Sequence, residues 1–513
     1  MSLMKYRIFI FLTIFFFSAN LIAEDELNIA YFSQDPPSII SLSQTFDPDS
    51  YAVITQIFDS LIYFDLDGKI QPALATHWQQ ESSTKWRFFL RKGVLFHNGE
   101  PFDAQAVKFT YDFILNPASK VGNRWILGAI KDVSLVPRDP YQVIIETHQP
   151  DNMLLNRLNM FGAICPPKYI KTKGFDYFQK HPIGTGPFLF ETWQKNHSIL
   201  LAKNPNYWQK GIPHYDKVRF KIIPQKDWLP AILSGEVDLV PNFPGNKTTE
   251  LMQKSNNEFR LVKRLVLAGY WVLIHNDGIF NNIKVRKALN YAINKSDLVR
   301  FGDFGNSIPL ASLGKKHEYG ANETLKPYPY DPKKAKALIS EASVPEQYKL
   351  TMLAADITAP IAKIIQSNLQ DIGFDVELDI VTRSEWAERV ITHKIITGKR
   401  SGYDIVINLV DNPIYHLGFH AGLFLDSRSP WSQLNDPEFN KRFDESMTTV
   451  DENQIETKLK ALDAYIHDNA LMIFTTQRIM TVVVSNTTSI DTYGLNGHLD
   501  YELISHAKKI KDD

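Results

Sequence analysis

The sequence has almost no cysteine and almost no net charge. Cys165 is the single cysteine among 513 residues, which excludes a framework of internal disulfides. Lysine and arginine number 56 against 57 aspartate and glutamate, so the net charge is −1. Recognition of nucleic-acid phosphates needs a basic face, and nucleic acid is therefore not expected as a partner. After residue 23 no apolar stretch approaches the roughly 20 residues that a membrane-spanning helix needs.

Motifs of common enzyme classes are also absent. No Gly-x-Ser-x-Gly nucleophile elbow occurs, and Cys165 precedes two prolines without an evident histidine partner in the sequence. No phosphate-binding P-loop occurs, so any energy coupling belongs to another protein. We therefore expect neither enzyme activity nor a cofactor, and a secreted hydrolase is the alternative that these absences disfavour.

The N-terminus has the order of a secretory signal peptide. Lys5 and Arg7 are followed by a nearly continuous apolar run at 8–22, and Ala23 then precedes the acidic Glu24. We expect cleavage after residue 23 and export to the periplasm. A lipid anchor would need a cysteine directly after the signal, and a retained N-terminal membrane anchor is the alternative to cleavage.

Strand-like and helix-like segments alternate along the rest of the chain. Apolar patterns predict strands at 27–32, 86–90, 133–136, 141–146, 218–223 and 376–380. Apolar residues at helical spacing predict helices at 49–58, 104–113, 282–293 and 361–369. Asp103 is expected to cap the second of these helices. The alternation indicates an α/β fold, and the length allows two or more domains.

A series of motifs in one order makes the chain similar to a known family. The longest motif runs from Trp86 to Ala104, and it continues into 107–112. The other motifs lie at 71–78, 182–188, 204–208, 235–239, 285–293, 330–335 and 369–374. Together they resemble the family 5 bacterial extracellular solute-binding proteins, which serve dipeptide, oligopeptide and nickel importers. The resemblance covers essentially the whole mature chain.

Most of these motif residues are expected to be scaffold. His97 belongs to a turn after a strand and is not expected to bind the ligand. Gly184 and Gly186 allow close packing of the chain between two stiffening prolines. Arg286 and Lys287 are expected at a solvated helix edge. The motifs therefore identify the family without contacting the solute.

The resemblance implies the type II periplasmic binding protein fold, in which two α/β lobes enclose a ligand cleft and an extra domain is inserted in the first lobe. The solute-binding region would be 24–508. The first lobe would gather about 24–62, 184–266 and 480–508, with the inserted domain at about 63–183 and the second lobe at about 267–479.

The implied function is solute capture for an ABC importer in the periplasm. A monomer would bind a peptide between its lobes and deliver it to membrane permease and ATPase subunits. A nickel chelate or another small solute is the alternative ligand. A peptide sensor or chaperone that uses the same cleft is the alternative function.

Asp411 and Asn412 follow a strand predicted at 403–407 and are candidate ligand residues. Peptide binders of the family place an aspartate in this loop to pair with the amino terminus of the ligand, as a charge-assisted hydrogen bond. The Gly-Asp-x-Pro-Asp-like run and nearby tryptophan of those binders are absent here. A turn-forming role for Asp411 is the alternative.

His416 and His420 lie just beyond this loop. Nickel binders of the family carry a histidine in this stretch, and spacing of four residues would place both imidazoles on one helical face. Gly418 weakens a helix here, and a third ligand is missing. Solvated or core histidines are the alternative, and we expect no metal site.

Two further pairs are candidates by resemblance. Arg124 and Trp125 match a segment of the inserted domain that faces the cleft. Arg124 would clamp a carboxylate and Trp125 would stack on the ligand, with an ordinary core tryptophan as the alternative. Tyr31 and Phe32 end the first strand and would border the cleft from the first lobe.

Overall fold

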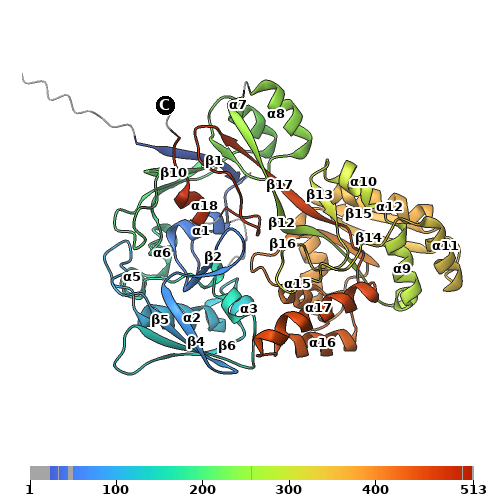
Figure 1. Ribbon diagram of the computed structural model, residues 1–513, viewed down its shortest axis with the longest axis horizontal. Coiled ribbons are helices and arrows are strands. Elements are labelled where there is room, and N and C mark those ends of the chain that lie inside the picture. The colour runs from blue at the N-terminus through green and yellow to red at the C-terminus, as the bar shows by residue number, and fades with distance from the viewer. Residues whose placement is uncertain (1–23, 33, 44–49, 256, 500, 511–513) are drawn as a thin grey trace, which may run out of the picture.

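The computed structural model describes residues 24–32, 34–43, 50–255, 257–499 and 501–510, and the predicted signal peptide lies outside them. An eleven-stranded sheet extends through both sides of the molecule (Figure 1). Its strands are, in spatial order, β15 (Asp375–Val381), β14 (Lys349–Ala355), β16 (Ile405–Asp411), β12 (Phe259–Ile274), β17 (Thr476–Ser485), β11 (Leu239–Val240), β1 (Glu26–Phe32), β10 (Lys217–Ile222), β9 (Ser198–Lys203) and β8 (Phe188–Gln194), with β13 (Ser307–Pro309) paired to β17.

Two long strands join the sides. β12 has 16 residues and pairs with β17 along its first part and with β16 along its second part. We call the side with β1 and β8–β11 the first half, and the side with β14–β16 the second half. Figure 1 shows the two halves side by side with β12 and β17 between them. The predicted α/β class is confirmed.

The second half is a sheet covered on both faces. Successive side chains of a strand point to opposite faces, so Tyr270, Val272 and Ile274 of β12 enter one core, whereas Trp271 and Leu273 enter the other. Strands buried on both faces need continuous apolar runs, which β12 and β16 have.

A second, four-stranded antiparallel sheet contributes a separate layer. Its strands are β4 (Ala75–Ser82), β5 (Lys85–Leu90), β7 (Gln142–Thr147) and β6 (Ile130–Leu135), and a short hairpin of β2 (Ile62–Phe64) and β3 (Ile70–Pro72) precedes it. Helix α2 (Ala104–Leu115) packs on this sheet. The carboxylate of Asp103 accepts from the backbone N–H of Gln105 at 2.8 Å and of Ala106 at 3.4 Å, which confirms the predicted cap. We call β4–β7 with α2, α3 (Arg124–Leu127) and α4 (Leu154–Arg157) the small-sheet region.

The remaining helices cover the sheets. They are α1 (Tyr51–Ile57), α3 (Arg124–Leu127), α4 (Leu154–Arg157), α5 (Pro167–Lys173), α6 (Phe175–Lys180), α7 (Trp228–Leu233), α8 (Thr248–Lys254), α9 (Ile283–Ala292), α10 (Lys295–Asp297), α11 (Pro332–Glu341), α12 (Ala359–Asp371), α13 (Arg383–Ala387), α14 (His393–Thr397), α15 (Leu417–Phe424), α16 (Pro437–Met447), α17 (Glu452–Asp468) and α18 (Tyr501–His506). Among the described residues, no helix is long and apolar enough to cross a membrane.

The glycine and proline motif at 182–188 packs against the end of α1. A Cβ on Gly184 would lie 2.0 Å from the carbonyl oxygen of Ile57, and one on Gly186 would lie 2.5 Å from that of Gln56. The His97 imidazole bridges the same loop, since Nε2 donates to the Gly186 carbonyl at 3.0 Å and Nδ1 accepts from the Gly184 N–H at 3.3 Å. The scaffold interpretation of this motif is confirmed.

Arg286 on α9 departs from the prediction. It is 8% exposed, and its guanidinium donates to the backbone carbonyls of Phe280 at 2.8 Å, Asn281 at 2.9 Å and Asn469 at 3.0 Å. The prediction of a solvated Arg286 is therefore wrong, because three backbone carbonyls accept hydrogen bonds from its guanidinium inside the fold. Lys287 is half-buried.

Candidate ligand-binding site

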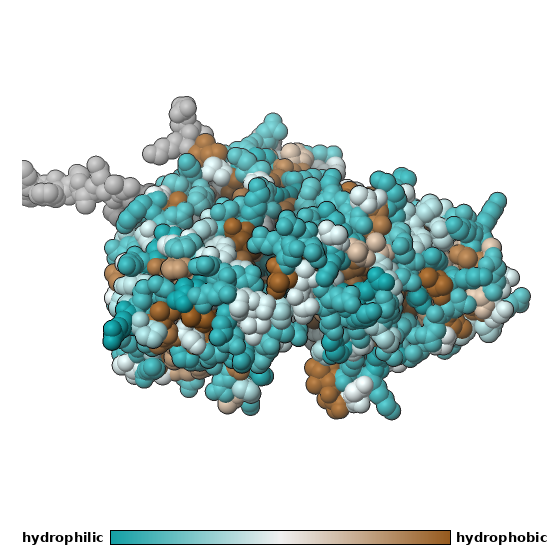
Figure 2. Space-filling view, turned by 60° about the horizontal axis from the view of Figure 1, so that its bottom comes forward, coloured by the Kyte–Doolittle hydropathy of each residue, from teal (hydrophilic) through white to brown (hydrophobic). Residues whose placement is uncertain are grey.

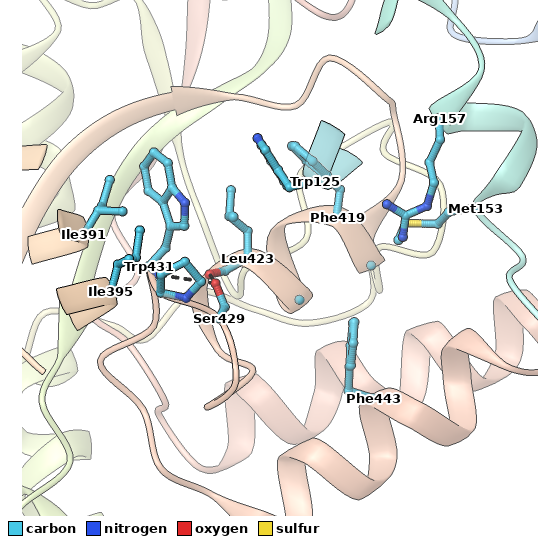
Figure 3. Close-up of a pocket in the computed structure, with 13 residues that line it drawn as sticks. Trp125, Met153, Arg157, Ile391, Ile395, Phe419, Leu423, Ser429, Trp431 and Phe443 are labelled. Carbon is cyan, nitrogen blue, oxygen red and sulfur yellow. Dashed lines mark hydrogen bonds between the residues drawn. The ribbon is translucent and has the colours of Figure 1, made fainter. Parts of the chain in front are cut away.

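A cavity of about 400 Å³ lies between the small-sheet region and the second half. The small-sheet region contributes Trp125 from α3, Met153, and Arg157 from α4, as Figure 3 shows. In the space-filling view of Figure 2, a mostly hydrophilic surface is hollowed between the two sides of the molecule. The opposite wall comes from α15, α16, the segment 429–431 and two isoleucines, Ile391 and Ile395.

Aromatic rings form much of the cavity wall. Trp125 stacks on Phe419 of α15, with ring centroids 5.9 Å apart and an angle of 16° between the planes. Trp431 and Phe443 extend this lining within the second half. Trp125 is 43% exposed, although tryptophan is usually buried for packing. An exposed ring at a cavity between two sides of a molecule is suited to stack on a bound molecule.

Direct contacts hold the small-sheet region against the second half. The Asn152 side chain donates to the Ser446 carbonyl at 2.8 Å, and the Asn156 side chain donates to the Ile414 carbonyl at 2.8 Å. The cavity is thus enclosed by parts of the chain that are nearly 300 residues apart in sequence. Such a site forms only when the two sides meet.

Asp411 is the last residue of β16, so the strand extends beyond the predicted 403–407, and the Asp411 carboxylate pairs with the imidazole of His498. His498 belongs to a C-terminal segment in which the Leu495 carbonyl accepts from the N–H of Leu267 at 2.7 Å. Burial opposes ionisation of Asp411, but the charge and hydrogen bond of His498 outweigh it and lower the pKa of Asp411 to about 2. The carboxylate is ionised at neutral pH.

Asn412, the other candidate in this loop, is fully buried. Its amide donates to the Glu318 carboxylate and to the His416 carbonyl, and its oxygen accepts from the Ile414 N–H at 3.2 Å. These bonds shape the loop after Asp411. Ligand contact by Asn412 stays a prediction.

The two histidines point to different partners. His420 lies in α15, where Nε2 donates to the Asp411 carbonyl at 3.1 Å and Nδ1 accepts from Lys315 Nζ at 3.2 Å. His416 caps α15 through Nδ1, which accepts from the Gly418 N–H at 3.0 Å. Burial and the nearby Arg157 lower the pKa of His416 to about 3, so this ring is neutral. Within the described ranges, no group of three or more His, Cys, Asp or Glu side chains is placed to hold a metal ion.

Of the predicted site residues only Trp125 lines the cavity, and the two pairs from the sequence that remain also lie apart from its wall. Arg124 is exposed, and its Nε donates to the Leu115 carbonyl at 3.0 Å. Tyr31 and Phe32 pack edge-on against each other with centroids 4.9 Å apart, and both rings lie near Phe220. Their contact with a ligand stays a prediction.

Sequence reasoning missed the residues that complete the cavity and the Asp411 pair. These residues are Arg157, Phe419, Trp431, Phe443 and His498. They stand outside any motif, and long-range packing brings them together. The only signal was compositional, since α15 and the segment after it are rich in aromatic residues.

The fold is that of the two-lobed periplasmic binding proteins. The periplasmic binding protein DppA of Helicobacter pylori, solved with the peptide STSA, has a TM-score of 0.79 at 24% identity, over 95% of this chain and 99% of that one. NikA of Brucella suis, solved with Fe(III)-EDTA, has a TM-score of 0.81 at 23% identity, over 94% and 100% of the chains. These likenesses confirm the predicted two-lobed fold.

The sequence model of the bacterial extracellular solute-binding proteins, family 5 (middle), matches residues 69–407. The chain belongs to this family. The glutathione-binding protein GsiB of Salmonella paratyphi A is 29% identical over 334 residues, and the Escherichia coli O1:K1 protein of that name is 28% identical over 334 residues. Each match spans 64% of this chain and 64% of the relative. The names of both relatives describe them as glutathione-binding proteins.

Proposed function

We propose that this chain is the periplasmic solute-capturing component of an ABC importer and that its solute is a short peptide. The chain would act without catalysis, as a monomer, and would pass the peptide to permease and ATPase subunits. The lobe boundaries predicted from the sequence belong to this proposal, as do export and cleavage of residues 1–23.

The cavity with walls from two sides of the molecule is the observation that carries the proposal. A solute in this cavity would contact Trp125 from the small-sheet region and Trp431 from the second half, so binding would favour the arrangement in which these two walls meet. Hinge closure around a ligand is a known mechanism of binding proteins. A permease can distinguish the loaded form from the empty form by this difference in shape.

Two observations favour a peptide as the solute, the charge of Asp411 and the ligands named for similar proteins. Asp411 offers an ionised carboxylate to the ammonium group of a ligand. The names of the relatives also refer to a peptide in two cases, glutathione and STSA. A nickel chelate is the alternative ligand within the same family.

A thermal-shift screen tests this proposal. The mature chain is mixed with di- and tripeptides, with single amino acids and with nickel–histidine chelate. We expect peptides to raise the Tm, because a ligand that binds only the folded state stabilises it. A rise in Tm with the chelate alone would mean that the ligand is a nickel chelate and not a peptide. An unchanged Tm with every class of compound would contradict solute capture.

Trp125→Ala is expected to lower peptide affinity about tenfold, because the variant removes a stacking surface worth about 0.5–1.5 kcal/mol beyond its buried area. Trp125→Phe keeps an aromatic face and should retain most of the affinity. Isothermal titration calorimetry with one peptide on all three proteins measures the difference. Equal affinities for Trp125→Ala and the wild type would place the ligand elsewhere.

A further inference from the structure

The cavity wall offers a guest almost no open polar groups. The Ser429 hydroxyl donates to the Leu423 carbonyl at 2.6 Å and accepts from the Trp431 N–H at 3.2 Å, so its proton is already used within the protein. Arg157 is the one charged residue of the wall, and its Nε donates to the Asp151 carboxylate at 2.8 Å. The wall is thus mainly apolar, and the charge of Arg157 is already paired with Asp151, while its Nη1 donates to the Ile126 carbonyl at 2.8 Å.

Size and shape also restrict the guest. A volume of about 400 Å³ is at the lower end of ligand sites, which span roughly 300–1,000 Å³. The faces of Trp125, Phe419 and Trp431 are broad and flat. The cavity therefore suits one or two bulky side chains and not a long extended chain.

Asp411 lies outside the cavity wall and is linked to it through α15. Phe419 forms part of the cavity wall, and its neighbour His420 donates to the Asp411 carbonyl at 3.1 Å. A ligand that spans both features would place its ammonium group at Asp411 and a side chain against the aromatic wall.

From this arrangement we infer that the cavity binds an uncharged, bulky apolar side chain of the solute. The substrate class is short peptides that carry an aromatic or branched aliphatic residue. Peptides with a charged residue at the same position are disfavoured, because burying a charge against apolar side chains is costly. The inference rests on the proposed function and adds the selectivity of the site.

Two adjacent isoleucines provide a matched pair of variants. Ile395 is 66% exposed and lines the cavity, whereas Ile396 is 76% exposed and does not. Ile395→Glu would place a carboxylate at the apolar wall, and Ile396→Glu would place the same charge on the nearby surface. Both positions are exposed enough for the variants to fold, which equal Tm values without ligand would verify.

Calorimetric titration with Ala-Phe, Phe-Ala, Ala-Ala, Ala-Glu and Ala-Lys tests the inference. We expect the better of the two phenylalanine peptides to bind at least about tenfold more tightly than the other three, since a filled apolar pocket discriminates by roughly 10–200-fold. We expect Ile395→Glu to lose about tenfold in affinity for that peptide, and Ile396→Glu to bind it as the wild type does.

The outcomes separate two failures. If the charged peptides bind as tightly as the phenylalanine peptides, or if the two variants behave alike while peptides bind, the inference is overturned and the proposed function stands. If the wild type binds none of these dipeptides and no tripeptide, the proposed function is overturned, and the inference is overturned with it.

Discussion

Asp411→Ala is expected to abolish binding of peptides with a free amino terminus, by a loss of about 2 to 5 kcal/mol in affinity. The loss follows because the ammonium group of the ligand would be left in a partly buried site without its counter-charge. Isothermal titration calorimetry with one tight-binding peptide measures it. An amino-acetylated form of the same peptide should bind weakly to the wild type and be insensitive to the variant.

The pair of Asp411 with His498 requires a second control. His498→Asn leaves the carboxylate in place, so this variant should retain peptide binding. Similar losses for Asp411→Ala and His498→Asn would mean that Asp411 acts only by supporting the structure. Unchanged peptide affinity in Asp411→Ala would mean that the amino terminus of the ligand binds at another site.

The low pKa of Asp411 determines the pH range over which its carboxylate is charged. Its folded-state pKa of about 2 lies below the ordinary value of 3.8. Asp411 therefore contributes stability above about pH 4, and the contribution is lost as the pH falls toward 2. Between pH 5 and 8 the carboxylate therefore stays ionised.

Gly184→Ala is expected to destabilise the fold by about 3 kcal/mol, because the new methyl group would collide with backbone that has little room to shift. The Cβ would lie 2.0 Å from the carbonyl oxygen of Ile57, and under 3.0 Å something must move. The free energy of unfolding from urea denaturation measures the loss. Gly402→Ala is the matched control, since a Cβ there meets nothing within 4 Å.

We expect Gly402→Ala to stay within about 0.5 kcal/mol of the wild type. Equal stability of Gly184→Ala and the wild type would show that the loop at 182–188 is less tightly packed on α1 than the structure indicates.

Local chemistry made much of the fold predictable from the sequence. The cap at Asp103 and the pattern of α9 depend on neighbouring residues, and both were predicted correctly within a residue or two. The tight loop at Gly184 was also predictable, because glycine and proline restrict the backbone in known ways. The burial of Arg286 was not predictable, because one of its hydrogen-bond acceptors, Asn469, is 183 positions away in the sequence.

The site was predictable only in part for the same reason. Trp125 and Asp411 could be proposed from motifs of the family. The residues opposite them, Phe419 and His498, reach their positions through the pairing of distant segments. The sequence of a loop does not indicate which distant side chain its carboxylate will meet, so the partner of Asp411 became evident only in the folded chain.

Native mass spectrometry of the mature chain, purified without added ligand and then titrated with a dipeptide mixture, tests solute capture most directly. We predict a bound state heavier than the protein by the mass of one peptide, with phenylalanine-containing peptides enriched, and its loss in Asp411→Ala. A spectrum that shows only the unliganded mass at every peptide concentration would contradict the account.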